Sequence, residues 1–384
     1  MSFDFLNRSQ SDSHKWLMAK GESKREDVLA FSVADSDYEV PTPIKQALQT
    51  RVAHGAFGYA KFQNTHRKAV RDWVNRRYHQ KVSLNWILPA PKVLSAISAA
   101  LLTFTREGDG VVIQTPVYHV FKPLIEDSKR VVIDSPLTRE GTAYTMDYTD
   151  LENTLSGNAK AMILCSPHNP VGRVWRKEEL EKVVALCKKH DVFLISDEIH
   201  ADIITGDVPF TTVASLWASY EKMIAINAPS KTFNIAGLQS AYILAPHRAI
   251  REALKQTLSG LHMLGFNVLA LRALLAAYNE SEAWVDAQNA HIKKNKAMLD
   301  AFLAGWGVQS APLEGTYLAW VDVSGFGMDS TQFCEALKQY GVVVSDGTQF
   351  GDGESTFVRI NLACASTQLD EGLSRIAAML EMRQ

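Results

Sequence analysis

Short apolar segments alternate with amphipathic ones between residues 111 and 244. The amphipathic segments, such as Lys177–His190, carry apolar residues at helical spacing. The apolar segments have no polar face, which is typical of parallel strands buried on both sides. The predicted strands are Val111–Gln114, Arg130–Asp134, Ala161–Ser166, Val192–Ser196, Met223–Asn227 and Ala241–Leu244. We therefore expect an α/β fold with a mainly parallel central sheet.

Two helices are predicted before this region. One begins at Pro41–Pro43 and runs to about Ala53, because proline fits the first turn of a helix and little beyond it. The other opens at Ala90–Leu94 and keeps helical spacing through Leu102. Its start is a phosphate-binding candidate because first-turn N–H groups are free, although most helix starts bind only water.

The pattern changes after about residue 280 and predicts a smaller α+β unit. Its expected elements are a helix Ala283–Leu303, a strand Tyr317–Val323, a helix Thr331–Tyr340, strands Val342–Ser345 and Phe357–Asn361, and a helix from Thr367 to about Met382 with capping-box spacing to Asp370. We expect a large domain over residues 46–282 and a small C-terminal domain over 283–384. Residues 1–45 form an N-terminal segment that packs with the small domain.

Composition narrows the function classes. The chain has 384 residues, 46% hydrophobic and 21% charged, with a net charge of -2. That balance predicts neither nucleic acid nor a membrane surface as a partner. No signal segment or long apolar run occurs, so a cytoplasmic location is expected. The four cysteines and eleven histidines show no ligand spacing, and we expect no metal.

Chemistry-bearing residues follow four of the predicted strands, where ligands collect in parallel sheets. They are Tyr118, Asn169, Asp197 and Lys231. A lysine after a buried strand either reaches water or is paired or chemically altered, for instance as a Schiff base. A lysine, a carboxylate, an amide and an aromatic ring together match the needs of a pyridine aldehyde cofactor. No GxGxxG joins a strand to a helix, which argues against a nicotinamide dehydrogenase.

Eight motifs in chain order carry a family resemblance. They are Ala34–Tyr38, Gly58–Tyr59, Thr115–Tyr118, Cys165–Gly172, Ser196–His200, Ser230–Leu238, Gly315–Trp320 and Phe357–Asn361. With them the chain resembles the fold-type I pyridoxal-phosphate (PLP) enzymes, whose large domain is aspartate-aminotransferase-like. Within these it is most similar to the MalY/PatB group of carbon–sulfur β-lyases, which includes cystathionine β-lyase and cysteine-S-conjugate β-lyase.

The resemblance implies roles for the central residues. Lys231 would be the Schiff-base lysine and then the base that takes the substrate Cα proton. Asp197 would pair with the pyridine nitrogen, and Asn169 would contact the cofactor O3′ and the substrate carboxylate. Arg359 would hold that carboxylate in a two-pronged pair, the geometry that suits guanidinium. Without the family, Arg359 is read as a surface ion pair.

The resemblance also implies a shell around the cofactor and substrate. Tyr118 and Ile199 would cover the two ring faces, His200 would lie near O3′ unless it is a core histidine, Val93, Leu94 and Ser230 would bind the phosphate, and Tyr59 would reach the phosphate from the other subunit of a homodimer. Tyr38 is assigned to the substrate, and Tyr38, Phe62 and Trp320 are candidate pocket walls. Ala34–Tyr38 is either a segment across the cleft or an ordinary loop.

Two positions depart from the related aminotransferases. Many of those place an arginine eight residues after the lysine, where this chain has Gln239, and a serine three residues before it, where this chain has Ala228. The phosphate must then rely more on Ser230, the helix start and Tyr59. The lyase group also lacks the arginine.

The resemblance implies α,β-elimination from L-cystathionine or an S-substituted cysteine, giving a thiol, pyruvate and ammonia. An aminotransferase shares the first step and differs in where the carbanion is reprotonated. A third interpretation is a PLP-binding regulator that acts through protein contacts. The preferred thioether does not follow from the sequence.

Overall fold

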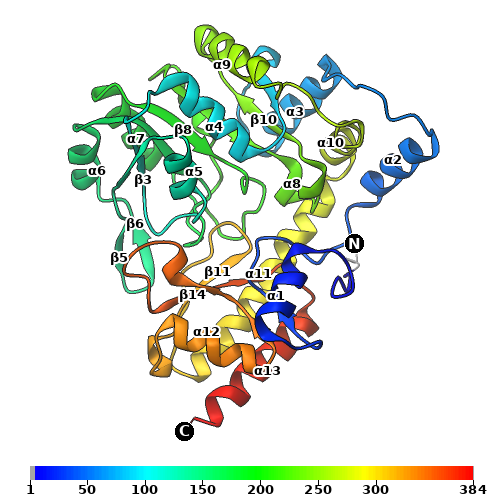
Figure 1. Cartoon of the computed structure of the whole chain (residues 1–384), viewed down its shortest axis with the longest axis vertical. Coiled ribbons are helices and arrows are strands. Elements are labelled where there is room, and N and C mark those ends of the chain that lie inside the picture. The colour runs from blue at the N-terminus through cyan, green and yellow to red at the C-terminus, as the bar shows by residue number, and fades with distance from the viewer. Residues whose placement is uncertain (1–4, 384) are drawn as a thin grey trace.

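The computed structural model describes residues 5–383. Its upper part in Figure 1 is built on a seven-stranded sheet with the order β2–β10–β9–β8–β7–β3–β4. The strands are β2 (Ile87–Ala90), β3 (Gly110–Ile113), β4 (Val131–Asp134), β7 (Ala159–Cys165), β8 (Phe193–Asp197), β9 (Met223–Asn227) and β10 (Ala241–Leu244). All neighbours pair in parallel except β10, which is antiparallel to β9 and β2. The predicted α/β fold with a mainly parallel sheet is confirmed.

Both faces of this sheet are buried, as its apolar strands require. Along β9, Ile224 and Ile226 pack into one core and Met223 and Ala225 into the other. The first face is covered by α4 (Val93–Phe104), α5 (Phe121–Asp127) and α9 (Arg248–Gly260), and the second by α3 (Asn64–Arg77), α6 (Tyr148–Leu155), α7 (Lys177–Lys189) and α10 (Val268–Glu280). Helix α2 (Thr42–Ala53) packs against α10.

The lower part of Figure 1 contains a second, three-stranded sheet. It is antiparallel, with the order β11 (Leu318–Asp322), β14 (Phe357–Asn361) and β13 (Ser345–Asp346). Beside it β1 (Leu29–Ala30) pairs in parallel with β12 (Val342–Val343), which joins the N-terminal segment to this part. The helices here are α1 (His14–Ser23), α12 (Ser330–Gln339) and α13 (Ser366–Glu381).

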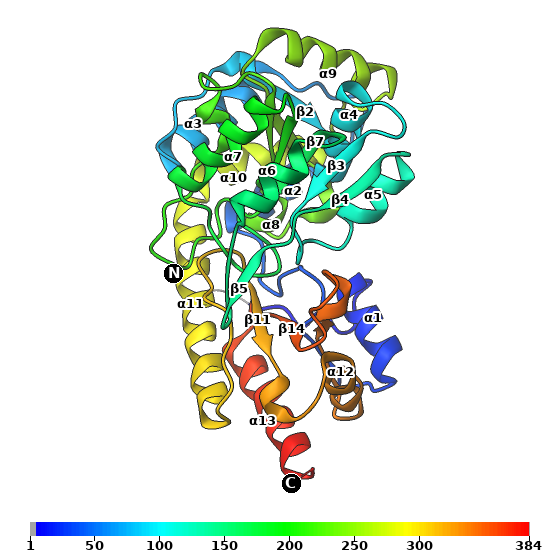
Figure 2. The same ribbon diagram turned by 90° about the vertical axis from the view of Figure 1, so that its left-hand side faces the viewer.

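Helix α11 (Glu282–Gly305) runs alongside both parts (Figure 2). It begins beside α10 under the large sheet and also packs against α13. The division at residues 45/46 and 282/283 stays a prediction. The remaining short elements are a hairpin of β5 (Thr138–Glu140) and β6 (Ala143–Thr145), the one-turn α8 (Pro229–Thr232), and 3-10 turns at Leu84–Trp86, Val213–Leu216, Ala236–Leu238, Ser324–Phe326 and Gly347–Gln349.

Three element predictions need correction. The predicted strand Val342–Ser345 is two strands, β12 and β13, in different sheets. The capping box at Thr367 was wrong, because α13 begins at Ser366 after Ala365, which makes no side-chain cap. Strand β2 was missed because it contains Pro89. As β2 is an edge strand that pairs only with β10, the missing N–H of that proline is tolerated.

No helix within residues 5–383 has the length and apolar character needed to cross a membrane. The cytoplasmic location stays a prediction.

Candidate active site

A cavity of about 520 Å³ lies at the carboxyl ends of the parallel strands. Adjacent strands bring their ends together there, since Cys165 of β7 pairs with Asp197 of β8 and Asp197 with Ile226 of β9. The helix starts of α4 and α8, and Arg359 of β14, complete the walls. The predicted residues that line it are Val93, Leu94, Tyr118, Asn169, Asp197, Ile199, His200, Ser230, Lys231 and Arg359.

Lys231 sits in α8, a single turn that follows β9 and starts at Pro229. Its Nζ donates a hydrogen bond of 2.5 Å to the backbone oxygen of Ala34. Burial lowers the pKa of its amine below the ordinary value. The next residue, Thr232, donates to the carboxylate of Asp202 at 2.8 Å and so fixes the turn. Lys231 is therefore an oriented amine that is more easily deprotonated than a surface lysine.

Asp197 is the last residue of β8 and is buried. Its carboxylate accepts a 3.1 Å hydrogen bond from the backbone N–H of Ile199. Burial raises the pKa of this carboxyl to about 7, against the weaker opposing effects of that hydrogen bond and of the Lys231 charge. No Lys, Arg or His side chain of residues 5–383 makes an ion pair with it, so a cationic ligand group is what this carboxylate would stabilise.

Arg359 lies on β14, directly opposite Ser345 of β13. Its guanidinium donates to the side chain of Asn169 at 2.9 Å, to the backbone oxygen of Ser32 at 2.9 Å and to the hydroxyl of Ser345 at 3.3 Å. It also lies over the ring of Phe350, at 4.6 Å. No carboxylate of residues 5–383 pairs with this buried cation, and burial lowers its pKa to about 10. The arrangement suits the carboxylate of a ligand.

The start of α4 supplies the second anion-binding feature. Lys92 precedes the helix, and Lys92, Val93 and Leu94 line the cavity. The first-turn N–H groups have no acceptor within the helix, and the helix dipole is positive there. Ser230 stands at the first turn of α8 in the same cavity, together with Ala228 and Gln239. This wall fits a phosphate group, and Arg359 is the single arginine among the described residues that line the cavity.

His200 is buried in the cavity wall, edge-on to Tyr317. Burial lowers its pKa to about 3, with Lys231 and Arg359 adding to the shift, so its imidazole is neutral near pH 7. Its Nδ1 has no hydrogen-bond partner within residues 5–383. His200 therefore lines the cavity with a buried, neutral ring, and its place near the cofactor O3′ stays a prediction.

The predicted pocket walls need correction. Tyr38 packs against Phe5, Trp284 and His291, and it does not line the cavity formed by the described residues. Phe62 stacks on Phe266, away from the cavity. Trp320 pairs with Arg359 in the sheet, yet its ring stacks on Phe357 and its indole donates to Tyr144. Size and aromatic character did not reveal that these rings fill cores.

Tyr59 is also outside the cavity of its own chain. Its side chain is fully exposed in the connection between α2 and α3. This placement leaves its predicted role, which requires a second copy of the chain, as a prediction.

Several residues at the cavity were missed. Ser32 accepts a hydrogen bond from Arg359 through its backbone oxygen, which side-chain reasoning cannot detect. Ala34 lies in the segment for which a place across the cleft was one of two alternatives, and the bond from Lys231 to its backbone oxygen was missed. His14, Met18 and Glu22 of α1 also line the cavity. Their spacing of four residues on one helix face was the available signal.

Comparison with known proteins now identifies the family. The model for "Aminotransferase class I and II" matches residues 26–376. The chain belongs to this family. Its structure superposes on cystalysin from Treponema denticola, which contains a pyridoxal 5′-phosphate cofactor, with a TM-score of 0.96, 33% identity and 100% coverage of both chains. The fold is therefore that of the fold-type I enzymes.

Two curated relatives are similar over most of their length. The chain is 37% identical to cystathionine beta-lyase PatB of Bacillus subtilis, over 92% of this chain and 93% of that protein. It is 32% identical to protein MalY of Escherichia coli, over 97% of each. The predicted resemblance to the MalY/PatB group is confirmed.

Proposed function

We propose that this family member is a PLP-dependent carbon–sulfur β-lyase. It would convert L-cystathionine or another S-substituted cysteine and water into a thiol, pyruvate and ammonia. The observation that carries this proposal is the meeting of Lys231, Asp197 and Arg359 in one cavity. The site offers an amine and, as far as residues 5–383 go, a carboxylate without a cationic partner and a guanidinium without an acidic partner. These are the groups that a pyridine aldehyde and an α-amino acid need. The similarity to PatB supports elimination as the outcome.

The residues present fit the cofactor. Lys231 would anchor it through its amine, and Asp197 would stabilise its protonated ring nitrogen. The N–H groups of Val93 and Leu94, with Ser230, would bind its phosphate. Tyr118 and Ile199 would cover its ring faces, with His200 beside O3′. Bound PLP supplies an electron sink that makes the Cα proton of an amino acid removable.

Residues of the chain then orient the substrate and remove its Cα proton. Arg359 and Asn169 hold the substrate α-carboxylate and so fix the orientation of Cα. The amine of Lys231, whose pKa burial lowers, takes the Cα proton. Departure of the thiolate from Cβ yields the thiol after protonation. Water then replaces the amino group of the remaining three-carbon unit. The three-carbon unit is released as pyruvate and the amino group as ammonia.

The test compares the two possible outcomes of proton removal. The purified protein with PLP is incubated with L-cystathionine, and pyruvate and free thiol are measured without an added keto acid. We expect both products in equal amounts, and neither from Lys231→Ala. Lys222→Ala is the control, since that lysine is exposed and paired with Asp191 at the opposite edge of the sheet. Amino-group transfer that strictly requires a keto acid would identify an aminotransferase and refute the proposal.

We also propose that the active enzyme is a homodimer with a composite site. The exposed ring of Tyr59 supports this, because a second copy could place it at the phosphate end of the cavity. Mixing Lys231→Ala with Tyr59→Ala subunits provides the test. If each site uses Lys231 of one chain and Tyr59 of the other, mixed dimers regain one intact site, and activity rises above that of either variant alone. Failure of the mixture to exceed both parents would contradict the composite site.

A further inference from the structure

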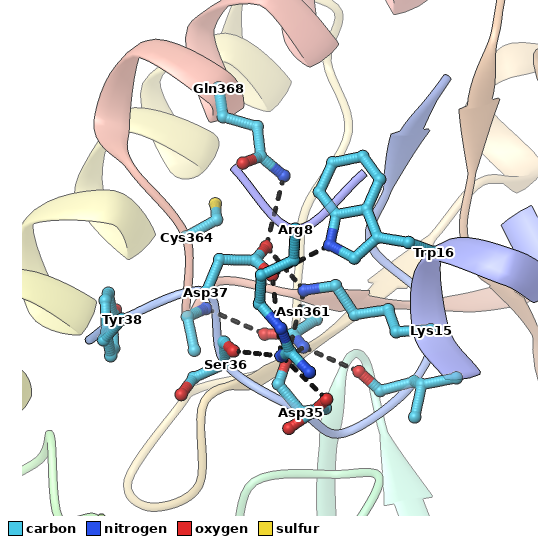
Figure 3. Close-up of polar contacts among 12 residues, drawn as sticks. Arg8, Lys15, Trp16, Asp35, Ser36, Asp37, Tyr38, Asn361, Cys364 and Gln368 are labelled. Atoms are coloured by element: carbon cyan, nitrogen blue, oxygen red, sulfur yellow. Dashed lines mark hydrogen bonds and ion pairs between the residues drawn. The ribbon is translucent and has the colours of Figure 1, made fainter. Parts of the chain in front are cut away.

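A buried ion pair connects α1 to the segment Ser32–Asp37. Nζ of Lys15 lies 2.6 Å from Oδ2 of Asp37, and each side chain is only 1% exposed. Figure 3 shows Lys15 and Trp16 extending from α1 toward Asp37, which also accepts a 3.0 Å hydrogen bond from the indole of Trp16. Burying two charges costs several kcal/mol each before their attraction is counted. A pair of apolar residues would fill this space at no such cost, so stability alone does not account for it.

The segment that this pair holds forms one wall of the active site. Five consecutive backbone oxygens, those of Ser32, Val33, Ala34, Asp35 and Ser36, accept side-chain hydrogen bonds. Ser32 receives Arg359, and Ala34 receives Lys231. Their positions therefore depend on how the segment is held.

Anchors on two sides hold the segment. On one side Asn361 of β14 donates to the backbone oxygens of Val33 and Asp35, at 2.7 and 2.8 Å. On the other side Lys15 donates to the oxygen of Asp35 at 3.1 Å and pairs with Asp37 (Figure 3). Arg8 adds to this side, since its guanidinium donates to the backbone oxygen of Ser36 at 2.7 Å and lies 2.8 Å from the Asp35 carboxylate. Without Lys15, the segment would keep Arg8 and the anchor on β14, but it would lose the bond from α1 to the Asp35 oxygen and the ion pair at Asp37.

Helix α1 is held by the same pair and by an apolar cluster, in which its Trp16 and Ala19 pack with Val28, Ala30 and Val343. It has ten residues, and neither a side-chain cap nor an acidic residue stabilises its first turn. Such a helix is marginal by itself and takes its position from tertiary contacts. Its buried face carries Lys15 and Trp16, while a different face presents His14 and Met18 to the cavity. The ion pair thus links two walls of the cavity to each other.

We propose that Lys15 and Asp37 are positioning residues of the active site, which hold the Ser32–Asp37 backbone against Lys231 and Arg359. The proposal deepens the proposed lyase function and rests on it for its kinetic consequences. The backbone oxygens of Ser32 and Ala34 affect different kinetic constants. Loss of support at Ser32 loosens the carboxylate clamp and raises KM, whereas loss at Ala34 misplaces the amine and lowers kcat. A purely structural pair would lower the amount of folded enzyme and leave KM unchanged.

The test uses the full chain, with and without PLP, and separates position from stability. Lys15→Met leaves the Asp37 carboxylate buried, so it should lower both stability and activity. The double variant Lys15→Met/Asp37→Leu removes both charges, so it should recover part of the free energy of unfolding, although the indole N–H of Trp16 then lacks its acceptor. It cannot restore the bond to Asp35, and its kcat/KM for L-cystathionine should stay roughly 10- to 100-fold below wild type, with a raised KM. Lys20→Met is the control, since Lys20 lies on the same helix and its exposed ion pair is with Glu26, beyond the end of that helix.

Amide hydrogen exchange of residues 32–38 in the cofactor-free chain gives a readout that needs no activity. We expect faster exchange than in wild type in both Lys15 variants. In Lys20→Met the exchange rates should equal those of wild type. Trp16→Phe removes one bond to Asp37 and should act in the same direction with a smaller size, which keeps the test informative if a Lys15 variant does not fold. Wild-type KM and wild-type exchange in the double variant would overturn the proposal. If wild type releases no pyruvate, the lyase function fails, while the exchange data still decide on positioning.

Discussion

Arg359 donates a 2.9 Å hydrogen bond to the side-chain oxygen of Asn169, although 190 positions separate the two residues. Arg359 belongs to β14 in the lower sheet, and Asn169 follows β7 in the upper one. The two sheets therefore meet at the point where the substrate α-carboxylate is proposed to bind. Any change in how they pack alters this site directly.

Replacing Arg359 by lysine should weaken substrate binding. Arg359→Lys keeps the charge but loses the planar fork, so it cannot bind a carboxylate and Asn169 together. We expect KM for L-cystathionine to rise at least roughly tenfold, since a charged hydrogen bond contributes about 1.5–3 kcal/mol. Steady-state kinetics measure this KM. Arg139→Lys is the control, because Arg139 is exposed and its guanidinium lies 3.6 Å from the carboxylate of Asp322. An unchanged KM would mean that Arg359 does not contact the substrate.

Asp197 should make the stability of the cofactor-free protein depend on pH. Burial raises the pKa of this carboxyl from its ordinary 3.8 to about 7, so the folded chain binds the proton more tightly than the unfolded chain does. The free energy of unfolding consequently falls as pH rises through this window and is lowest above it. Asp197→Asn has no proton to lose. Without cofactor, it should be more stable than wild type at pH 8, and this gain should shrink toward pH 5.

Urea denaturation of the cofactor-free proteins at the two pH values measures this effect. Saturating PLP should reverse the order, because only wild type offers the carboxylate that stabilises a protonated ring nitrogen, and bound ligand adds to stability. Asp191→Asn is the control, as that carboxylate is 74% exposed. A gain that does not vary with pH would show that Asp197 is already ionised in the folded chain.

The buried carboxylate of Asp202 binds the turn α8, which carries Lys231. It accepts hydrogen bonds from Trp73 at 3.0 Å, Tyr78 at 2.7 Å and Thr232 at 2.8 Å. Thr232→Val keeps the shape but leaves this carboxylate one donor short. We expect a loss of about 1–3 kcal/mol in the free energy of unfolding. Thr331→Val is the matched control, since Thr331 makes a similar 2.7 Å bond to Asp346 at an exposed position. If both variants lost the same free energy of unfolding, burial of the Asp202 carboxylate would not be the cause of the loss.

The sequence predicted the upper sheet and its strand-end residues well because both follow from local pattern. Six of its seven strands are continuous apolar runs, and Lys231, Asp197 and Asn169 follow strands that end at one edge. Arg359 was different, because nothing on β14 distinguishes a cavity arginine from a surface one. Its role came from the family resemblance, and the structure supplies Asn169 as its partner.

The parts that could not be predicted depend on backbone position and long-range packing. The oxygens of Ser32 and Ala34 carry no side-chain signal, and Lys15 looks like any helical surface lysine until Asp37 is placed beside it. Tyr38, Phe62 and Trp320 show the reverse error, since large rings suit a pocket wall and a core equally well. Residue type gives the chemistry of a group, and only packing decides which space it faces.

Gly347 offers a test of how closely the backbone packs near the cavity. A Cβ at this position would lie within 2.5 Å of the backbone oxygen of Glu354 and closer still to that of Phe357, the first residue of β14. Backbone cannot give way as a flexible side chain can, so Gly347→Ala must displace β14 or the turn that carries Gln349 to the cavity. We expect a loss of about 1–3 kcal/mol in the free energy of unfolding and, because Arg359 lies on β14, a raised KM.

Gly260→Ala is the control, since a Cβ there meets nothing within 4 Å. Because Gly260 ends α9, alanine should leave stability unchanged or slightly improved, by about 0.4–1 kcal/mol. Gly347→Ala with wild-type stability and KM would show that the turn yields without moving β14.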